Sequence, residues 1–179
     1  MKLLFFFFKK LRGLYRYFIK KPTWIIFYLL AAKSNRNIFP FLFNFLSFFY
    51  KSNTKVSLGK DNCYYINKNE WRFFYNRGIA NYAKGLKNQK KSLREVYLLN
   101  QIKINEEDVI IDVGAHNGDF YLCFENKIQY YAIEPSPISY SNLVYNVRDQ
   151  VLLNYGAWKS NDEKIDFFLK EKSSDSSII

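Results

Sequence analysis

Two carboxylate residues and a glycine-containing loop have the residue types and the spacing of a chemical site. The segment 112–118 reads DVGAHNG, so that Asp112 stands before a loop containing Gly114 and Gly118, and Glu134 follows 22 residues after Asp112. Glycine lets a chain turn sharply and lets a ligand approach the main chain. An acid about 20 residues beyond such a loop commonly accepts the hydroxyls of a ribose. This spacing predicts a site for a nucleoside-containing ligand.

The order of acid and glycine in the loop narrows the class of ligand. A dinucleotide fingerprint requires G-x-G-x-x-G, whereas here an acid precedes the first glycine. A carboxylate at this point repels a pyrophosphate and suits an amino group and a positive sulfonium, both of which S-adenosylmethionine carries. Residues 101–179 hold 13 acidic and 7 basic side chains, which agrees with a cationic ligand. Taken singly, the glycines are equally typical of a plain strand-to-helix turn, and Glu134 of an exposed strand end.

The elements that must position these residues form an alternating pattern, which predicts an α/β fold. The pattern consists of a strand buried on both faces, a helix, a second strand, a second helix and a third strand, at Val109–Val113, Asp119–Glu125, Tyr130–Ile133, Pro137–Val147 and Val151–Asn154. Right-handed crossovers would place the three strands in one parallel sheet with the ligand at their carboxyl ends.

Helix ends and inward faces are also predicted. Ser136 can cap the second helix, with Pro137 in its first turn. A capping box at 92–95 predicts a further helix from Ser92 to about Gln101. The residues predicted to face inward from these two helices are Tyr140, Leu143, Val144, Val147, Leu93, Val96 and Leu99.

Between about Ser92 and Ile179 the sequence contains an ordered set of short motifs: Asp112–Phe120, Ala132–Pro137, Asn142-Leu143 with Asn146-Val147, Asn154–Ala157 and Asp175–Ser177. This set resembles the FkbM family of S-adenosylmethionine-dependent methyltransferases. The resemblance implies a Rossmann-like class I methyltransferase sheet and transfer of a methyl group to a hydroxyl of a sugar, a glycan or a secondary metabolite.

The resemblance also implies roles for individual residues. The methionine part of the cofactor is cradled by Asp112, Gly114, Ala115 and Gly118, its ribose is bound by Glu134, and its adenine lies near Gly156 and Ala157. Asn117 and Pro135 complete the implied set of cofactor-binding residues. His116 is interpreted as a solvated neighbour, because the family does not require it.

The predicted sheet is the N-terminal half of the family's seven strands. The chain continues past the third strand only with a short strand at Ile165–Leu169, and we interpret it as C-terminally truncated or dependent on a partner. We name no catalytic residue, because the general base is expected downstream of Ile179. The alternatives are a catalytically incomplete fragment that acts as a cofactor-binding or membrane-surface module, and a nicotinamide oxidoreductase.

The first 60 residues differ from the rest in composition. They hold 12 basic and no acidic side chains. A helix over residues 1–21 would place Leu3, Phe7, Leu11, Leu14 and Phe18 on one side and basic residues opposite. This pattern suits peripheral contact of residues 1–50 with an anionic membrane, although a helix packed on the rest of the protein fits it equally. Nucleic-acid binding is not expected, because no recognised binding motif accompanies the basic residues.

The predicted organisation has three parts: a basic aromatic helical segment (1–60), a loop-rich adaptor (61–91) and a partial methyltransferase domain (92–179). Apolar stretches at 24–32 and 38–50 are too short or too interrupted to span a membrane. No signal peptide is predicted, so we expect a cytoplasmic protein. Cys63 and Cys123 indicate neither a disulfide framework nor a metal site.

Overall fold

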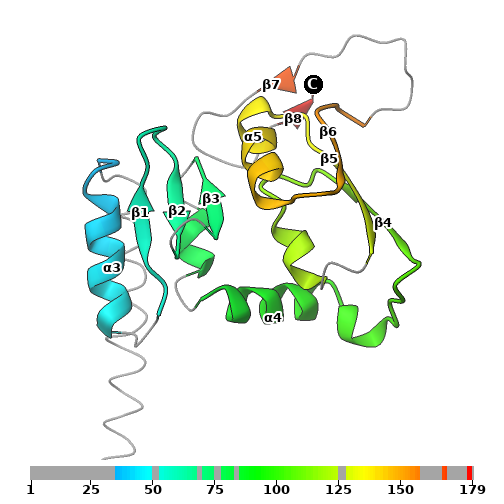
Figure 1. The fold of residues 1–179 in the computed structure, drawn as a ribbon, viewed down its shortest axis with the longest axis horizontal. Helices are drawn as coiled ribbons and strands as arrows, with labels where there is room; N and C mark the ends of the chain where they lie inside the picture. Colours follow the sequence, from blue (N-terminus) through cyan, green and yellow to red (C-terminus); the bar gives the residue numbers. More distant parts are fainter. Residues whose placement is uncertain are drawn as a thin grey trace, which may run out of the picture.

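The structure is a computed structural model. It describes residues 35–49, 53–67, 70–74, 78–82, 85–124 and 128–157, together with the backbone of 167–168 and 177–178. The predicted helix at 1–21 and the apolar stretch at 24–32 lie outside the described residues. Figure 1 shows α3 and a small antiparallel sheet at one end of the molecule and a parallel sheet at the other, with α4 running beneath both.

The first layer is a helix packed on three short strands. Helix α3 (Phe39–Phe49) covers strands β1 (Val56–Leu58), β2 (Tyr64–Ile66) and β3 (Trp71–Phe73), which pair antiparallel in that order. Alternate residues of β2 and β3 point toward the helix and are buried. The resulting core consists of Phe39, Phe43, Val56, Tyr64, Ile66, Trp71, Phe73, Ile79 and Tyr82.

This layer corrects the prediction of a loop-rich adaptor over 61–91. That segment contains β2, β3, the 3-10 helix η2 (Gly78–Tyr82) and the start of α4. Strands of three residues are too short for their alternation to stand out in the sequence. The core also joins residues on both sides of position 60, and α4 runs across position 91.

Helix α4 (Leu86–Val96) connects the two ends of the molecule and begins six residues earlier than predicted. The N-cap of α4 is Gly85, which has a φ of 93°. Ser92 therefore lies within the helix and does not cap it. Leu98 adopts a left-handed conformation, and the 3-10 helix η3 (Leu99–Gln101) follows. Leu99 is buried and Leu93 is half-buried, as predicted, whereas Val96 is 71% exposed, contrary to the prediction.

The parallel sheet confirms the predicted alternation of strands and helices. Strands β4 (Val109–Val113), β5 (Gln129–Ile133) and β6 (Val151–Leu153) pair parallel in the order β4-β5-β6. The first connection carries a 3-10 helix, η4 (Asp119–Cys123), where a longer helix was predicted. The second carries α5 (Pro137–Asn146), in which Ser136 accepts the backbone N–H of Ser139 (3.4 Å) and Pro137 occupies the first turn, as predicted.

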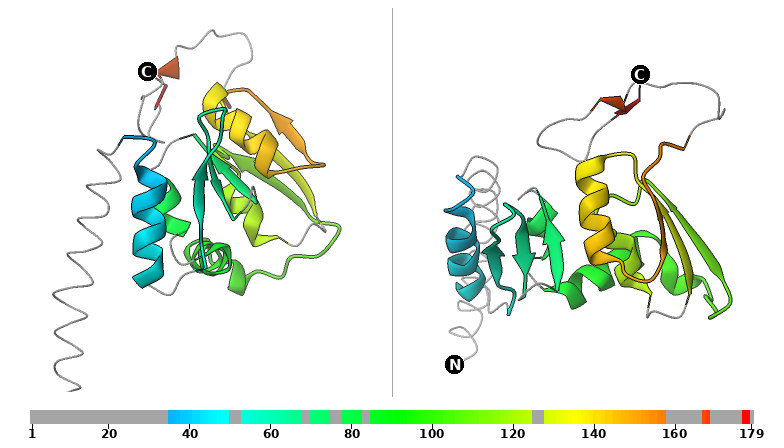
Figure 2. Two further views of the ribbon diagram at one scale, coloured as in Figure 1. Left: turned by 60° about the vertical axis from the view of Figure 1, so that its left-hand side comes forward. Right: turned by 45° about the horizontal axis from the view of Figure 1, so that its top comes forward.

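One face of this sheet carries the second core, and the other does not. The buried members are Leu99, Ala115, Tyr121, Cys123, Phe124, Tyr130, Ala132, Leu143 and Val147. Val144 is exposed, contrary to the prediction, because α5 turns Asn142 and Leu143 inward. Val109, Ile111 and Val113 are 51%, 65% and 59% exposed, so the prediction that β4 is buried on both faces is wrong. Figure 2 shows η4 and α5 on the side of the sheet nearer β3.

Strands β7 (Phe167–Phe168) and β8 (Ser177–Ile178) pair antiparallel near the end of the chain. The first of them confirms part of the strand predicted at Ile165–Leu169. No helix within the described residues is long and apolar enough to cross a membrane.

Candidate cofactor site at the carboxyl ends of the parallel strands

The carboxyl ends of β4, β5 and β6 meet through backbone hydrogen bonds. The N–H groups of Gly114 and Ala115 donate to the carbonyl of Ile133 at 2.8 and 3.1 Å, and the N–H of Glu134 donates to the carbonyl of Leu153 at 3.0 Å. The glycine loop and Glu134 therefore lie at the same edge of the sheet, as the sequence spacing predicts.

Glu134 ties the glycine loop to the start of α5. One of its carboxylate oxygens accepts the backbone N–H of His116, and the other accepts that of Ser136, both at 2.8 Å. The residue is only 6% exposed. These donors fix the orientation of the carboxylate, and each oxygen keeps a further lone pair for another donor.

Asp112 lies on the face of the sheet that carries α5. Its carboxylate accepts the hydroxyl of Tyr130. Burial raises the pKa of Asp112, the hydrogen bond from Tyr130 opposes this shift, and the negative charges of Glu134 and Asp119 add to it. Burial likewise raises the pKa of Tyr130, so the phenol stays protonated and donates.

Asp119, directly after the glycine loop, is a further acid that the sequence analysis did not select. Its carboxylate accepts the hydroxyl of Tyr82 at 2.6 Å. Burial raises the pKa of Asp119, against the effects of Tyr82, His116 and Trp71. The indole N–H of Trp71 is buried and has no hydrogen-bond partner of good geometry in the described part of the chain. No sequence signal links Tyr82 to Asp119, because 37 positions separate them.

The glycines of the loop have different surroundings. Both have positive φ values, 80° at Gly114 and 86° at Gly118. A Cβ at Gly114 would meet nothing within 4 Å, whereas one at Gly118 would lie 2.5 Å from a methyl of Val147 and 3.0 Å from one of Leu143. Gly114 thus leaves its main chain open to a ligand, and Gly118 allows the loop to pack against α5.

Asn117 is directed into the protein rather than toward the sheet edge. Its side-chain oxygen accepts the amide of Asn142 at 3.1 Å, and its carbonyl accepts the amide of Asn146 at 2.8 Å. Asn117 is buried. These contacts give it a structural role in fixing the loop on α5.

The residues predicted to lie near adenine are at the surface of the same edge. Gly156 and Ala157 are exposed, and Pro135 is half-buried. A Cβ at Gly156 would have nothing within 4 Å. The amide of Asn154 donates to the carbonyls of Glu134 (2.7 Å) and Pro135 (3.3 Å), which holds the segment after β6 against the end of β5.

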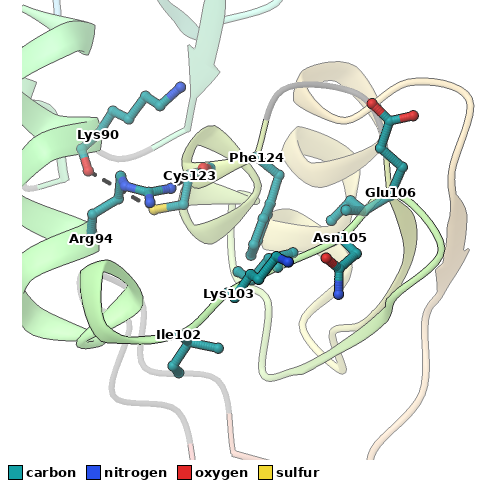
Figure 3. A pocket seen from close by; sticks show the side chains of 10 residues that line it. Lys90, Arg94, Ile102, Lys103, Asn105, Glu106, Cys123 and Phe124 are labelled. Carbon is teal, nitrogen blue, oxygen red and sulfur yellow. Dashed lines mark hydrogen bonds between the residues drawn. The ribbon is translucent and has the colours of Figure 1, made fainter.

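Two cavities lined by described residues lie away from this edge. The larger, of about 540 Å³, lies between α4, the segment that leads into β4 and the end of η4, and Figure 3 shows Lys90, Arg94 and Lys103 among its lining side chains. The other, of about 410 Å³, is lined by Tyr121, Asn146, Arg148, Asp149 and Gln150. Neither contains a predicted cofactor-binding residue.

No family model, curated protein or solved structure matches the chain. Within the described residues, no group of three or more His, Cys, Asp or Glu side chains is arranged to hold a metal ion. Both cysteines are free and buried.

Proposed function

We propose that this chain binds S-adenosylmethionine at the carboxyl ends of β4, β5 and β6, as the cofactor-binding part of a methyltransferase that resembles the FkbM family. The observation that carries the proposal is the meeting of Glu134 with the glycine loop, through the hydrogen bond from the N–H of His116 to the Glu134 carboxylate. This contact supports the proposal because it brings the residues expected to bind the ribose and the methionine part to one edge of the sheet.

The residues present fit this cofactor on three counts. The backbone at Gly114 is open, so that the methionine part can lie against the main chain. Glu134 is held in one orientation and can still accept ribose hydroxyls. Burial raises the pKa of Asp112, and the negative charges of Glu134 and Asp119 raise it further, so that a cationic ligand beside these acids would favour the ionised carboxylate.

The chain's own contribution to the reaction would be binding and orientation. When bound, S-adenosylmethionine supplies an electrophilic methyl group. Glu134 and the main chain at Gly114 would fix the position of the cofactor, since in-line transfer depends on the alignment of acceptor and methyl donor. The FkbM resemblance points to a hydroxyl of a sugar, glycan or secondary metabolite as the acceptor.

Calorimetric titration of the purified chain with S-adenosylmethionine tests the proposal. We expect binding by the wild type and a loss of at least tenfold in affinity in Glu134→Gln, which removes the charge and turns an NH2 donor toward the N–H of His116 or Ser136, because hydrogen bonds to a charged group contribute about 1.5–3 kcal/mol. Glu107→Gln, at an exposed position before β4, is the matched control and should bind as the wild type.

Three outcomes would contradict the proposal: no heat with S-adenosylmethionine, equal affinity in Glu134→Gln, or binding of NADH in its place. The last outcome would favour a nicotinamide oxidoreductase. Binding without methyl transfer to any hydroxyl acceptor would support the incomplete fragment that acts as a cofactor-binding module.

A second candidate function, contact with an anionic membrane, is favoured by the end of the molecule that carries α3. Phe41 on α3 is 70% exposed, and Ile38, directly before the helix, is also exposed. Residues 1–60 contain no acidic side chain. Exposed apolar side chains in a segment whose charged residues are all basic suit the headgroup region of anionic lipid.

A further inference from the structure

The cavity of about 540 Å³ between α4 and the segment that leads into β4, which we call the α4 cavity, has an apolar wall. Phe124 is buried, and Ile104 and Ile128 are half-buried and pack against the second core. Ile102 also lines the cavity and is exposed. The volume lies within the range of about 300–1,000 Å³ that is typical of small-molecule sites. The α4 cavity therefore offers a bound molecule an apolar surface.

The charged side chains that line the α4 cavity are mainly basic. Lys90 and Arg94 lie one turn apart on α4, Lys103 follows η3, and Glu106 is the one acid among the ten described residues that line it. Figure 3 shows the carboxylate of Glu106 pointing away from the Arg94 guanidinium. Burial raises the pKa of the Cys123 thiol, and the positive charges of Arg94 and Lys90 oppose that shift. Both charges thus act on the end of η4 that lines the cavity.

Arg94 is held in place and still has hydrogen-bond donors to offer. Its Nε donates to the side-chain oxygen of Asn100 at 3.3 Å, and its Nη1 donates to the carbonyl of Cys123 at 3.0 Å. A guanidinium has five N–H groups, and the others have no partner within the described part of the chain. Lys103 is exposed, and its ammonium forms no hydrogen bond or ion pair with a described residue. An oriented guanidinium of this kind suits a carboxylate or a phosphate, which can accept two parallel hydrogen bonds from it.

We propose that the α4 cavity binds a small amphiphilic anion. Its carboxylate or phosphate group meets Arg94 and Lys103, and its apolar body lies against Phe124 and the isoleucines of the wall. An uncharged apolar molecule would leave the donors of Arg94 unpaired where it excludes water, which costs binding free energy. An inorganic anion would leave the apolar wall in contact with water. A ligand that carries both parts satisfies both surfaces.

This site is separate from the proposed cofactor site. The α4 cavity is lined by the segment that leads into the start of β4, whereas the glycine loop follows the end of that strand. Five residues at about 3.3 Å each span roughly 17 Å. Methyl transfer requires the reacting atoms to lie about 3–3.5 Å apart, so a molecule in the α4 cavity is not the methyl acceptor. Each site can be tested in the absence of the other ligand.

Calorimetric titration of the full chain with four probes tests the proposal. Octanoate and octyl phosphate combine a charged group with an apolar body, octanol lacks the charge, and inorganic phosphate lacks the apolar body. We expect heat of binding from one or both of the amphiphilic anions and an affinity at least tenfold lower for octanol and inorganic phosphate. The tighter of the two anions identifies the head group as a carboxylate or a phosphate.

Charge-removing variants locate the binding. Arg94→Gln should lower the affinity for the amphiphilic anion at least about tenfold, because it removes a charge-assisted hydrogen bond. Lys103→Gln should lower it about threefold, as expected for an exposed charge, and it breaks no contact between described residues. Lys91→Gln removes the same charge from an exposed position on α4 that does not line the cavity, and it should bind as the wild type.

Nuclear magnetic resonance of the wild type keeps the test decisive if circular dichroism shows that Arg94→Gln is unfolded. Octyl phosphate or octanoate should shift the backbone amide signals of Cys123 and Ile128 and leave those of Gly114 and Ala115 unchanged, which separates this site from the cofactor site. Octanol that binds as tightly as the anions would overturn the proposal. So would inorganic phosphate that binds as tightly as octyl phosphate, equal affinities in Lys103→Gln and Lys91→Gln, or amide shifts confined to other parts of the chain.

Discussion

At the scale of single residues, the two glycines of the loop are needed for different reasons, which the sequence motif alone does not distinguish. Gly114 and Gly118 share a left-handed backbone, yet one faces open space and the other faces the methyl groups of Val147 and Leu143. The proposed binding function therefore rests on Gly114, and the packing of the loop rests on Gly118.

Alanine substitutions should separate these two requirements. Gly114→Ala is expected to lower the free energy of unfolding by about 1–2 kcal/mol, the cost of a Cβ in the left-handed region. Gly118→Ala adds a steric overlap with α5 and should lower it by about 2–5 kcal/mol. Urea denaturation of both variants measures the difference. Equal losses would show that Val147 and Leu143 move aside at little cost.

At the scale of elements, the parallel half of the molecule could be predicted from the sequence and the antiparallel half could not. A five-residue run with four β-branched residues predicts β4, and a Ser-Pro cap predicts the start of α5. By contrast, β1–β3 have three residues each, and their packing depends on contacts with α3 that are remote in the sequence. The predicted start of α4 at Ser92 is wrong because the S-x-x-E pattern also occurs inside helices. The N-cap is Gly85 instead.

The candidate site could be predicted only in part from the sequence. Glu134 and the glycine loop meet because their spacing reflects one strand-helix-strand unit. The inward turn of Asn117 and the contact of Tyr82 with Asp119 were not predictable, because their partners come from other elements of the fold.

Strand β3 and helix α5 are joined by a polar contact that links the two sheets. Arg72 and Asn146 exchange two hydrogen bonds, from the Arg72 N–H to the Asn146 side-chain oxygen (2.7 Å) and from the Asn146 amide to the Arg72 carbonyl (2.9 Å). The guanidinium of Arg72 also donates to Asn142 at 2.9 Å and to the carbonyl of Ser141 at 2.8 Å. This contact fixes the small sheet beside α5, the helix against which the glycine loop packs.

Asn146→Ala should weaken the junction between the two sheets. We expect the free energy of unfolding to fall by about 1–3 kcal/mol, because the backbone groups of Arg72 and Asn117 lose their partner. Asn100→Ala, which removes one exposed hydrogen bond of 3.3 Å to Arg94, is the control and should change it by less than about 0.5 kcal/mol. The urea midpoints of both variants measure these effects, and equal midpoints would mean that the junction contributes no stability.

At the scale of the whole molecule, charge and apolar surface divide the chain into two ends with different predicted contacts. The end that carries α3 presents Phe41 and Ile38, and residues 1–60 contain no acid, whereas the other end presents the exposed apolar residues of β4 and the acids around the glycine loop. A basic, apolar surface is attracted to anionic lipid, and an uncharged apolar face is not.

Flotation of the full chain with lipid vesicles tests the membrane contact of the basic end. We expect more protein to float with vesicles of phosphatidylserine and phosphatidylcholine than with phosphatidylcholine alone. The excess should fall as salt rises to about 1 M, where the Debye length is about 3 Å. Phe41→Ser should reduce binding to the anionic vesicles, because it removes apolar area from the interface, whereas Val96→Ser on α4 should leave it unchanged. Equal recovery with both kinds of vesicle, or insensitivity to salt, would contradict electrostatic binding of residues 1–60 to a membrane. Either result would favour a basic segment that packs on protein.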